Sequence, residues 1–451
     1  MNTDTLDRAV DTATAGAGTT QEAGNGTESA LRFMTCGSVD DGKSTLIGRL
    51  LVDSRAVLQD QLASVSRSGV TDLALLTDGL SAEREQGITI DVAYRYFTTA
   101  QRKFIIADAP GHVQYTRNMV TAASGANAAV VLVDASKLRW QDPQLELLAQ
   151  TRRHSLLVHL LRVPSVVFAV NKLDAVADPE LAFEHIRGAL ARFAEAAQIE
   201  VCAVLSISAL LGHNVVDAAP GWCGYHGPSL LQLLEQLPST AAEPALPFAF
   251  PVQWVEKFSD SSDTSQGRRV FWGRVASGSV QLGQQLRVMP GGQLASVAGL
   301  LDHVRQPASR AAGHSAGIVL DRELDVSRGD WLLAQVGPDG TDPRMALVER
   351  REISATVAWM DDEPLVAGRT YWALHGHRWV KARVRRISHR LNIETLERED
   401  AQRIEANAIG HVELVLQEPL AVLPYSLSRV LGSLVLVDTA THSTAGALLV
   451  D

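Results

Sequence analysis

The sequence predicts an α/β domain with a mostly parallel sheet and helices on both faces, followed by two β-barrel domains. Four continuous apolar runs indicate the sheet, because strands covered by helices on both faces show little polar alternation. These runs are residues 104–108, 128–134, 165–171 and 201–208. Beyond residue 247 short strand-like runs alternate with glycine turns, a pattern that is typical of small barrels.

A chain of 451 residues is too long for one hydrophobic core, so several domains are expected. Residues 1–29 are rich in Thr, Ala, Gly and acidic side chains, which predicts a disordered tail. We expect the α/β domain to occupy residues 30–238, and a proline-punctuated linker to follow it. The two barrels are then expected at 247–338 and 352–451.

Charge, hydropathy and cysteine spacing argue against several classes of protein. The formal net charge of −10 argues against a surface that binds nucleic acid over its whole extent. The sequence has no run of eighteen apolar residues, and its first residues lack the basic start and apolar stretch of a signal peptide. Three cysteines (Cys36, Cys202 and Cys223) have neither disulfide nor metal-ligand spacing. We therefore predict a cytoplasmic protein without a membrane partner, and its charge disfavours a nucleic-acid partner without excluding a local basic patch.

Residues 37–44 read Gly-Ser-Val-Asp-Asp-Gly-Lys-Ser and match the phosphate-loop pattern G-x-x-x-x-G-K-[S/T]. An apolar run precedes the match and helix-like spacing follows it, as a true P-loop requires. Lys43 would reach the outer phosphates in a catalytic role, and the hydroxyl of Ser44 would hold Mg²⁺. The expected nucleotide contacts in this loop are Gly37, Ser38, Val39, Asp40, Asp41, Gly42, Lys43, Ser44 and Thr45.

Two further motifs predict a nucleotide-dependent switch. Asp-Ala-Pro-Gly at 108–111 follows an apolar strand, so that Asp108 would contact Mg²⁺ through water and the amide of Gly111 would sense a terminal phosphate. In the second motif, Gln-Gly-Ile-Thr-Ile at 86–90, Thr89 would add a second hydroxyl ligand once a triphosphate orders its loop. The expected metal ligands are Ser44, Thr89 and Asp108, and the nucleotide contacts include Ala109 and Pro110.

The motif Asn-Lys-Leu-Asp at 171–174 predicts which nucleotide base is bound. A carboxylate at Asp174 can accept two hydrogen bonds from guanine, whereas adenine would leave that charge unpaired. The stem of Lys172 would lie over the base. After the last strand of the domain, a backbone amide of Ser208, Ala209 or Leu210 would donate to the guanine carbonyl oxygen. With Asn171 these residues predict a P-loop GTPase domain that binds GTP with Mg²⁺.

Hydrolysis is predicted at His112, directly after the Asp-Ala-Pro-Gly motif. Its imidazole could orient a water molecule for in-line attack on the terminal phosphate. A histidine that merely caps the following helix is the simpler alternative. Asp40 is a candidate ligand for a monovalent cation near the phosphates.

The order of these motifs resembles that of the elongation-factor class of GTPases. The residues within and around the motifs are more similar to one particular branch of that class, which is not a translation factor. Ser38 and Asp41 stand where translation factors typically carry histidines. The segments 78–97, 102–108, 114–119 and 151–155 are similar to those of the GTP-binding large subunit (subunit 1) of bacterial sulfate adenylyltransferase, also called ATP sulfurylase.

That resemblance implies a two-subunit enzyme of sulfate assimilation, on the route to cysteine, that makes adenosine 5′-phosphosulfate and pyrophosphate from ATP and sulfate. A separate small subunit would perform the adenylyl transfer, and GTP hydrolysis on this chain would drive it. The expected assembly is a heterodimer or a multiple of it. Some members of the family carry a fused kinase; since no second phosphate loop follows the barrels, we do not expect that activity here.

An elongation-factor-like GTPase that delivers an RNA or protein ligand is the alternative. Lys381, Arg383 and Arg385 alternate with apolar residues, which places three cations on one face of a strand. An ordinary solvated strand face is the simpler interpretation. The functional interpretation is that these cations contact an acidic protein or RNA.

Overall fold

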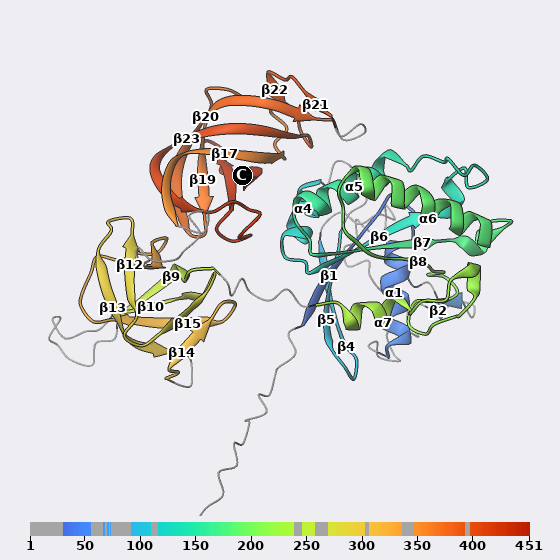
Figure 1. Ribbon diagram of the computed structural model, residues 1–451, viewed down its shortest axis with the longest axis horizontal. Coiled ribbons are helices and arrows are strands. Elements are labelled where there is room, and N and C mark those ends of the chain that lie inside the picture. The colour runs from blue at the N-terminus through green and yellow to red at the C-terminus, as the bar shows by residue number, and fades with distance from the viewer. Residues whose placement is uncertain are drawn as a thin grey trace, which may run out of the picture.

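The computed structural model describes residues 30–55, 66–67, 70–71, 73, 92–109, 116–238, 246–257, 269–302, 306–335, 347–392 and 397–451. They form an α/β domain and two barrels (Figure 1). The predictions for the tail 1–29 and for Thr89, Pro110, Gly111 and His112 lie outside these residues. None of the described helices has both the length and the apolar character needed to cross a membrane.

A six-stranded sheet forms the centre of the α/β domain. Its strands are β1 (Leu31–Cys36), β4 (Ala93–Thr98), β5 (Lys103–Asp108), β6 (Ala128–Asp134), β7 (Ser165–Asn171) and β8 (Val201–Ser206). Their spatial order is β4-β5-β1-β6-β7-β8, with only the edge strand β4 antiparallel to its neighbour. All residues of β6 and β7 are buried, which explains their continuous apolar sequences.

Helices cover both faces of this sheet, as predicted. Their bounds are α1 (Lys43–Asp53), α4 (Thr116–Ser124), α5 (Ala149–Leu160), α6 (Pro179–Ala196) and α7 (Leu230–Gln236). The first and last pack on one face, and the other three on the opposite face. The helix α6 begins where the side chain of Asp178 accepts a hydrogen bond from the amide of Leu181 at 3.2 Å.

Short elements complete the α/β domain. They are the 3₁₀ turns η3 (Ala135–Lys137), η4 (Leu173–Ala175) and η5 (Trp222–Gly224), and the paired strands β2 (Ser66–Arg67) and β3 (Val70–Thr71). The turns η3 and η4 directly follow β6 and β7, so they lie at the carboxyl edge of the sheet, where open α/β sheets bind ligands.

The first barrel is closed in the order β10-β15-β13-β12-β16-β9. Its strands are β9 (Ala249–Lys257), β10 (Arg269–Arg274), β12 (Gln285–Met289), β13 (Leu294–Leu301), β15 (Ser315–Leu320) and β16 (Trp331–Ala334), and the pair β11 (Ser279–Gln281) and β14 (Ser309–Ala311) lies beside them. Its interior contains Phe250, Phe271 and Ile318, which are buried.

The second barrel closes through the pairing of β19 with β20. Its strands are β17 (Val348–Trp359), β19 (Thr370–His375), β20 (Arg378–Leu391), β23 (Ile409–Val422), β24 (Ser433–Asp438) and β25 (Thr444–Val450), with the short strands β18 (Leu365–Val366), β21 (Arg398–Glu399) and β22 (Arg403–Ile404). Trp359 and Tyr371 meet edge-to-face in its interior, with ring centroids 5.5 Å apart. The prediction of two barrels is confirmed.

The second barrel contacts both other bodies (Figure 1). Toward the first barrel, Arg378 forms an ion pair with Asp330 at 2.9 Å, and the ring of His375 stacks on Trp331. Toward the α/β domain, the hydroxyl of Tyr425 donates to the carbonyl oxygen of Leu161 at 2.8 Å. The second barrel is therefore joined to the α/β domain and to the first barrel by direct contacts.

Candidate nucleotide-binding site

The phosphate loop lies between β1 and α1, at the carboxyl edge of the sheet. Gly42 has φ 92° in the left-handed region, and a β-carbon at this position would lie 2.5 Å from Nδ2 of Asn171. Only glycine fits there without displacing that side chain. The second glycine of the motif is thus required both by the turn and by a residue 129 positions later in the chain.

Lys43 lies across this loop. Its ammonium group donates to the carbonyl oxygens of Gly37 at 3.2 Å and Ser38 at 2.8 Å. Burial lowers the pKa of Lys43, while the carboxylates of Asp108 and Asp41 oppose that shift. The side chain is therefore fixed at the loop, where a bound phosphate would supply the anionic partner.

The interior of the loop is held by Asp41, whose side chain is fully buried. One oxygen accepts from the amide of Ser38 at 2.5 Å, and the other lies 3.1 Å from Nζ of Lys137, which also contacts the carbonyl oxygen of Val39. Asp40 is exposed and has φ 62°. Lys137 was not predicted from the sequence as a residue of this site. Its position shortly after the buried strand β6, at the carboxyl edge of the sheet, could have indicated that it lies near the loop.

Ser38 makes a second long-range contact. Its hydroxyl donates to Oε1 of Gln150, in the first turn of α5, at 2.6 Å. This contact gives a physical role to one of the two loop residues that differ from the histidines of translation factors. The other, Asp41, forms the ion pair with Lys137.

Asn171, at the end of β7, joins the phosphate loop to the predicted base-reading loop. Its Nδ2 donates to the carbonyl oxygen of Asp41 at 2.8 Å, and its Oδ1 accepts from the amide of Ala209 at 3.0 Å. The hydroxyl of Ser208 accepts from the amide of Leu211 at 3.0 Å, and Leu210 is 63% exposed. These bonds bring residues 171 and 208–210 together, as expected from the sequence.

Lys172 and Asp174 flank the turn η4. Lys172 has φ 62°, and its Nζ lies 2.8 Å from Oδ2 of Asp134. Burial alone raises the pKa of Asp134, but hydrogen bonds from Lys172 and Ser136 outweigh burial and hold that pKa below its usual value. Asp174 is exposed, so its carboxylate is accessible to a base.

Arg49 of α1 is a second residue of the site that was not predicted from the sequence. Its guanidinium donates to the carbonyl oxygen of Ala209 at 3.3 Å and also contacts that of Leu210. It forms an ion pair with Asp53 at 3.5 Å. The helix that follows the phosphate loop therefore also supports the loop after β8.

The predicted metal site is described in part. Oδ1 of the buried Asp108 accepts from the hydroxyl of Thr35 at 3.2 Å, and the amide of Ala109 donates to the carbonyl oxygen of Thr35 at 3.3 Å. Ser44 is the second residue of α1. A hydroxyl and a carboxylate are oxygen donors of the kind that Mg²⁺ prefers, so the described residues fit that ion.

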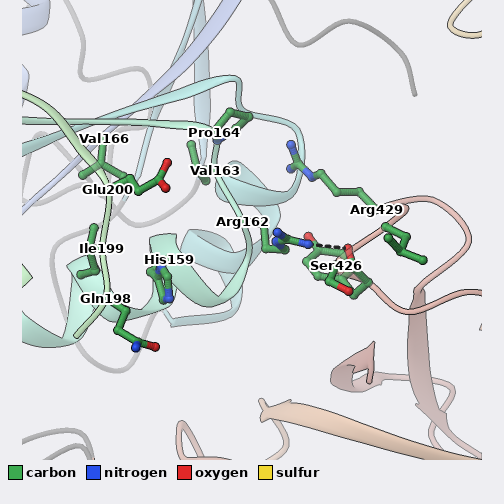
Figure 2. A pocket seen from close by; sticks show the side chains of 12 residues that line it. His159, Arg162, Val163, Pro164, Val166, Gln198, Ile199, Glu200, Ser426 and Arg429 are labelled. Carbon is green, nitrogen blue, oxygen red and sulfur yellow. Dashed lines mark hydrogen bonds between the residues drawn. The ribbon is translucent and has the colours of Figure 1, made fainter. Parts of the chain in front are cut away.

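A cavity of about 410 Å³ lies at the opposite edge of the sheet, between the residues that precede β7 and β8 and the segment 425–429 of the second barrel (Figure 2). Arg162 donates to the carbonyl oxygen of Tyr425 at 3.3 Å. Arg429 donates to carbonyl oxygens at the end of α4, with the shortest bond to Ser124 at 2.6 Å. Since both guanidinium groups bind backbone carbonyls, the cavity belongs to the junction between the domains.

The cations on β20 are exposed, as predicted for one strand face. Lys381 lies over the ring of Trp372 at 5.4 Å, and Arg385 pairs with Glu352 at 3.0 Å. Two of the three charges therefore have local partners, which favours the interpretation as an ordinary solvated face.

Comparison with known proteins identifies the family. A "Sulfate adenylyltransferase subunit 1" from Laribacter hongkongensis is 43% identical over 429 residues, which cover 93% of this chain and 85% of that protein. The chain belongs to the sulfate adenylyltransferase subunit 1 family. Its residues 28–242 match the family described as "Elongation factor Tu GTP binding domain", and residues 352–450 match "GTP-eEF1A C-terminal domain-like".

Two other relatives support the same family assignment. The "Sulfate adenylyltransferase subunit 1" of Salmonella paratyphi C is 41% identical and covers 94% of this chain and 86% of its own length. The "Bifunctional enzyme CysN/CysC" of Xylella fastidiosa is 45% identical over 93% of this chain, but only 65% of that protein is matched. The sulfate adenylyltransferase subunit 1 resemblance seen in the sequence is confirmed.

Proposed function

We propose that this chain is the GTP-binding and GTP-hydrolysing subunit of a heteromeric sulfate adenylyltransferase. It couples GTP hydrolysis to formation of adenosine 5′-phosphosulfate and pyrophosphate from ATP and sulfate. The observation that carries the proposal is the similarity to the Laribacter hongkongensis subunit 1 over 93% of this chain. The contacts of Asn171 with both nucleotide loops support it.

In this proposal each group at the carboxyl edge of the sheet has one task. Lys43 and the loop amides bind the phosphates, and Asp174 accepts hydrogen bonds from guanine while Lys172 covers the base. Mg²⁺, which would be held by Ser44, Thr89 and Asp108, neutralises phosphate charge when it is bound. His112 orients the attacking water. A monovalent cation at Asp40 completes the proposed site.

Adenylyl transfer itself is assigned to a separate small subunit, with which the chain forms a heterodimer or a multiple of it, in the cytoplasm. The same proposal includes the domain boundaries, which are a tail at 1–29, a GTPase domain at 30–238 and barrels at 247–338 and 352–451. The name "subunit 1" of the relatives supports the need for a partner subunit.

The decisive experiment uses the purified chain together with a small adenylyltransferase subunit, ATP and sulfate. Formation of adenosine 5′-phosphosulfate is measured with GTP, with GDP, and with a non-hydrolysable GTP analogue. We expect product to exceed its GTP-free level only when GTP is hydrolysed. Equal product under all three conditions would contradict the coupling.

A translational role is the second and weaker candidate, because it rests on the exposed cations of β20, and two of these three residues, Lys381 and Arg385, already have local partners. Stimulation of GTP turnover by ribosomes, with no response to the small subunit, would favour that candidate.

A further inference from the structure

Lys137 is the last residue of η3 and lies beside the phosphate loop. Its Nζ is 3.1 Å from Oδ1 of Asp41 and 3.7 Å from Oδ2 of Asp134, and it contacts the carbonyl oxygen of Val39. Asp41 and Val39 accept hydrogen bonds from this ammonium group, whereas Asp134 lies at ion-pair distance. The turn that carries Lys137 is itself fixed, because the amide of Ser136 donates to Asp134 at 3.0 Å.

Asp41 depends on this cation. Its carboxylate is fully buried, and its second oxygen accepts from the amide of Ser38 at 2.5 Å. Burial raises the pKa of Asp41, and Lys137 provides the largest opposing effect. Lys43 is also near, but its ammonium group donates to carbonyl oxygens of the loop. Without Lys137 the carboxylate would be a buried charge without its paired cation, and the turn 38–41 would have to rearrange.

The same ammonium group reaches the base-reading elements. Asp134, at the end of β6, lies between Lys137 and Lys172, whose Nζ is 2.8 Å from Oδ2 of Asp134. Lys172 precedes the proposed guanine-reading Asp174 by two positions. A continuous series of charged contacts therefore runs from the phosphate loop through Lys137 and Asp134 to Lys172.

We propose that Lys137 is a positioning residue of the nucleotide site, which fixes the phosphate loop through Asp41 and Val39 and joins it to Lys172 through Asp134. This inference rests on the proposed binding of GTP. An exposed ion pair would contribute little, but here the acidic partners are buried and the side chain of Lys137 is 34% exposed. Lys137 itself contacts the loop and not the reacting atoms, so we expect it to affect the affinity for the nucleotide.

The test compares Lys137→Ala with Arg139→Ala, a matched control two positions away whose exposed side chain is outside the proposed site. Equilibrium and stopped-flow binding of a fluorescent GDP, competed with GTP, are measured on the full chain. We expect Lys137→Ala to raise the Kd for both nucleotides about tenfold, mainly through faster dissociation. Arg139→Ala should stay within about twofold of wild type.

Two readouts separate positioning from general stability. In GTP hydrolysis, Lys137→Ala should raise KM about tenfold while kcat stays within about twofold, because Lys137 supports the loop equally in the ground state and in the transition state. In an Asp41→Asn background, which removes the buried charge, the effect of Lys137→Ala on Kd should shrink to less than about threefold.

If Lys137→Ala fails to fold, Lys137→Gln keeps a long polar side chain without the charge and should show the same rise in Kd. Binding within about twofold of wild type by either folded variant would overturn the inference. An undiminished effect in the Asp41→Asn background would also overturn it. Absence of GDP and GTP binding by the wild-type chain would instead overturn the proposed function, and this inference with it.

Discussion

The side-chain amide of Asn171 donates a hydrogen bond to the backbone carbonyl oxygen of Asp41 at 2.8 Å. This bond joins the end of β7 to the phosphate loop after β1, although β6 separates the two strands in the sheet. Because the oxygen of the same side chain accepts from the amide of Ala209, one buried residue fixes two loops. Nucleotide affinity should therefore be sensitive to Asn171 even if its side chain never touched the nucleotide.

The first prediction concerns this bridge. Asn171→Ala would leave a buried carbonyl oxygen and a buried amide without partners, which costs about 2 kcal/mol or more of folding free energy. We expect a lower unfolding midpoint in urea and a binding of GDP that is weaker by about tenfold or more. Chemical denaturation and GDP titration check both effects. An unchanged GDP affinity would show that the two loops keep their positions without this bridge.

The second prediction concerns the choice of base. Asp174→Asn replaces a double acceptor by an amide that can donate to the 2-oxygen of xanthine. We expect GTP affinity to fall on the order of 100-fold and xanthosine triphosphate to become the preferred nucleotide. Competition binding with both triphosphates measures this. If the order of preference stays as in the wild type, Asp174 does not read the base.

The third prediction concerns hydrolysis. His112→Ala should lower the rate of GTP turnover about 100-fold, because an oriented water molecule is lost, while the Kd for GTP stays near its wild-type value. Single-turnover hydrolysis and equilibrium binding separate the two quantities. A full rate in the variant would leave the helix-capping alternative as the explanation of this histidine.

The fourth prediction concerns pH and the junction of the two barrels. Burial lowers the pKa of His375 to about 4, although its contact with the carbonyl oxygen of Leu431 opposes this. In the unfolded chain this histidine binds a proton near pH 6.5, so its contribution to stability is complete above that pH. Stability should fall by up to about 3 kcal/mol as the pH drops from about 6.5 to about 4.

Replacing His375 by Gln removes the titrating group and should flatten this part of the curve. His154, whose pKa burial lowers to about 3, contributes with the same sign and remains in the variant. Urea unfolding of wild type and variant at about pH 7, 5.5 and 4.5 tests the prediction. Parallel curves for the two proteins would mean that His375 does not contribute.

The class of fold and the order of its parts followed from local patterns. The strands β6 and β7 have the predicted bounds because a strand buried on both faces must be apolar throughout its length. The phosphate loop, residues 171–174 and residues 208–210 all come at strand ends, and parallel strands place such ends at one edge. The sequence alone therefore predicted which segments would meet.

Only the tertiary structure decided which atoms meet. Lys137 and Asp41 are 96 positions apart, and Ser38 and Gln150 are 112 positions apart, so no local period relates them. Their contacts depend on the sheet order, which places β6 directly beside β1, and on the turn that aims each side chain. A sequence motif identifies the nucleotide loop, but the partners of its side chains, Lys137 and Gln150, come from neighbouring segments that only the folded sheet supplies.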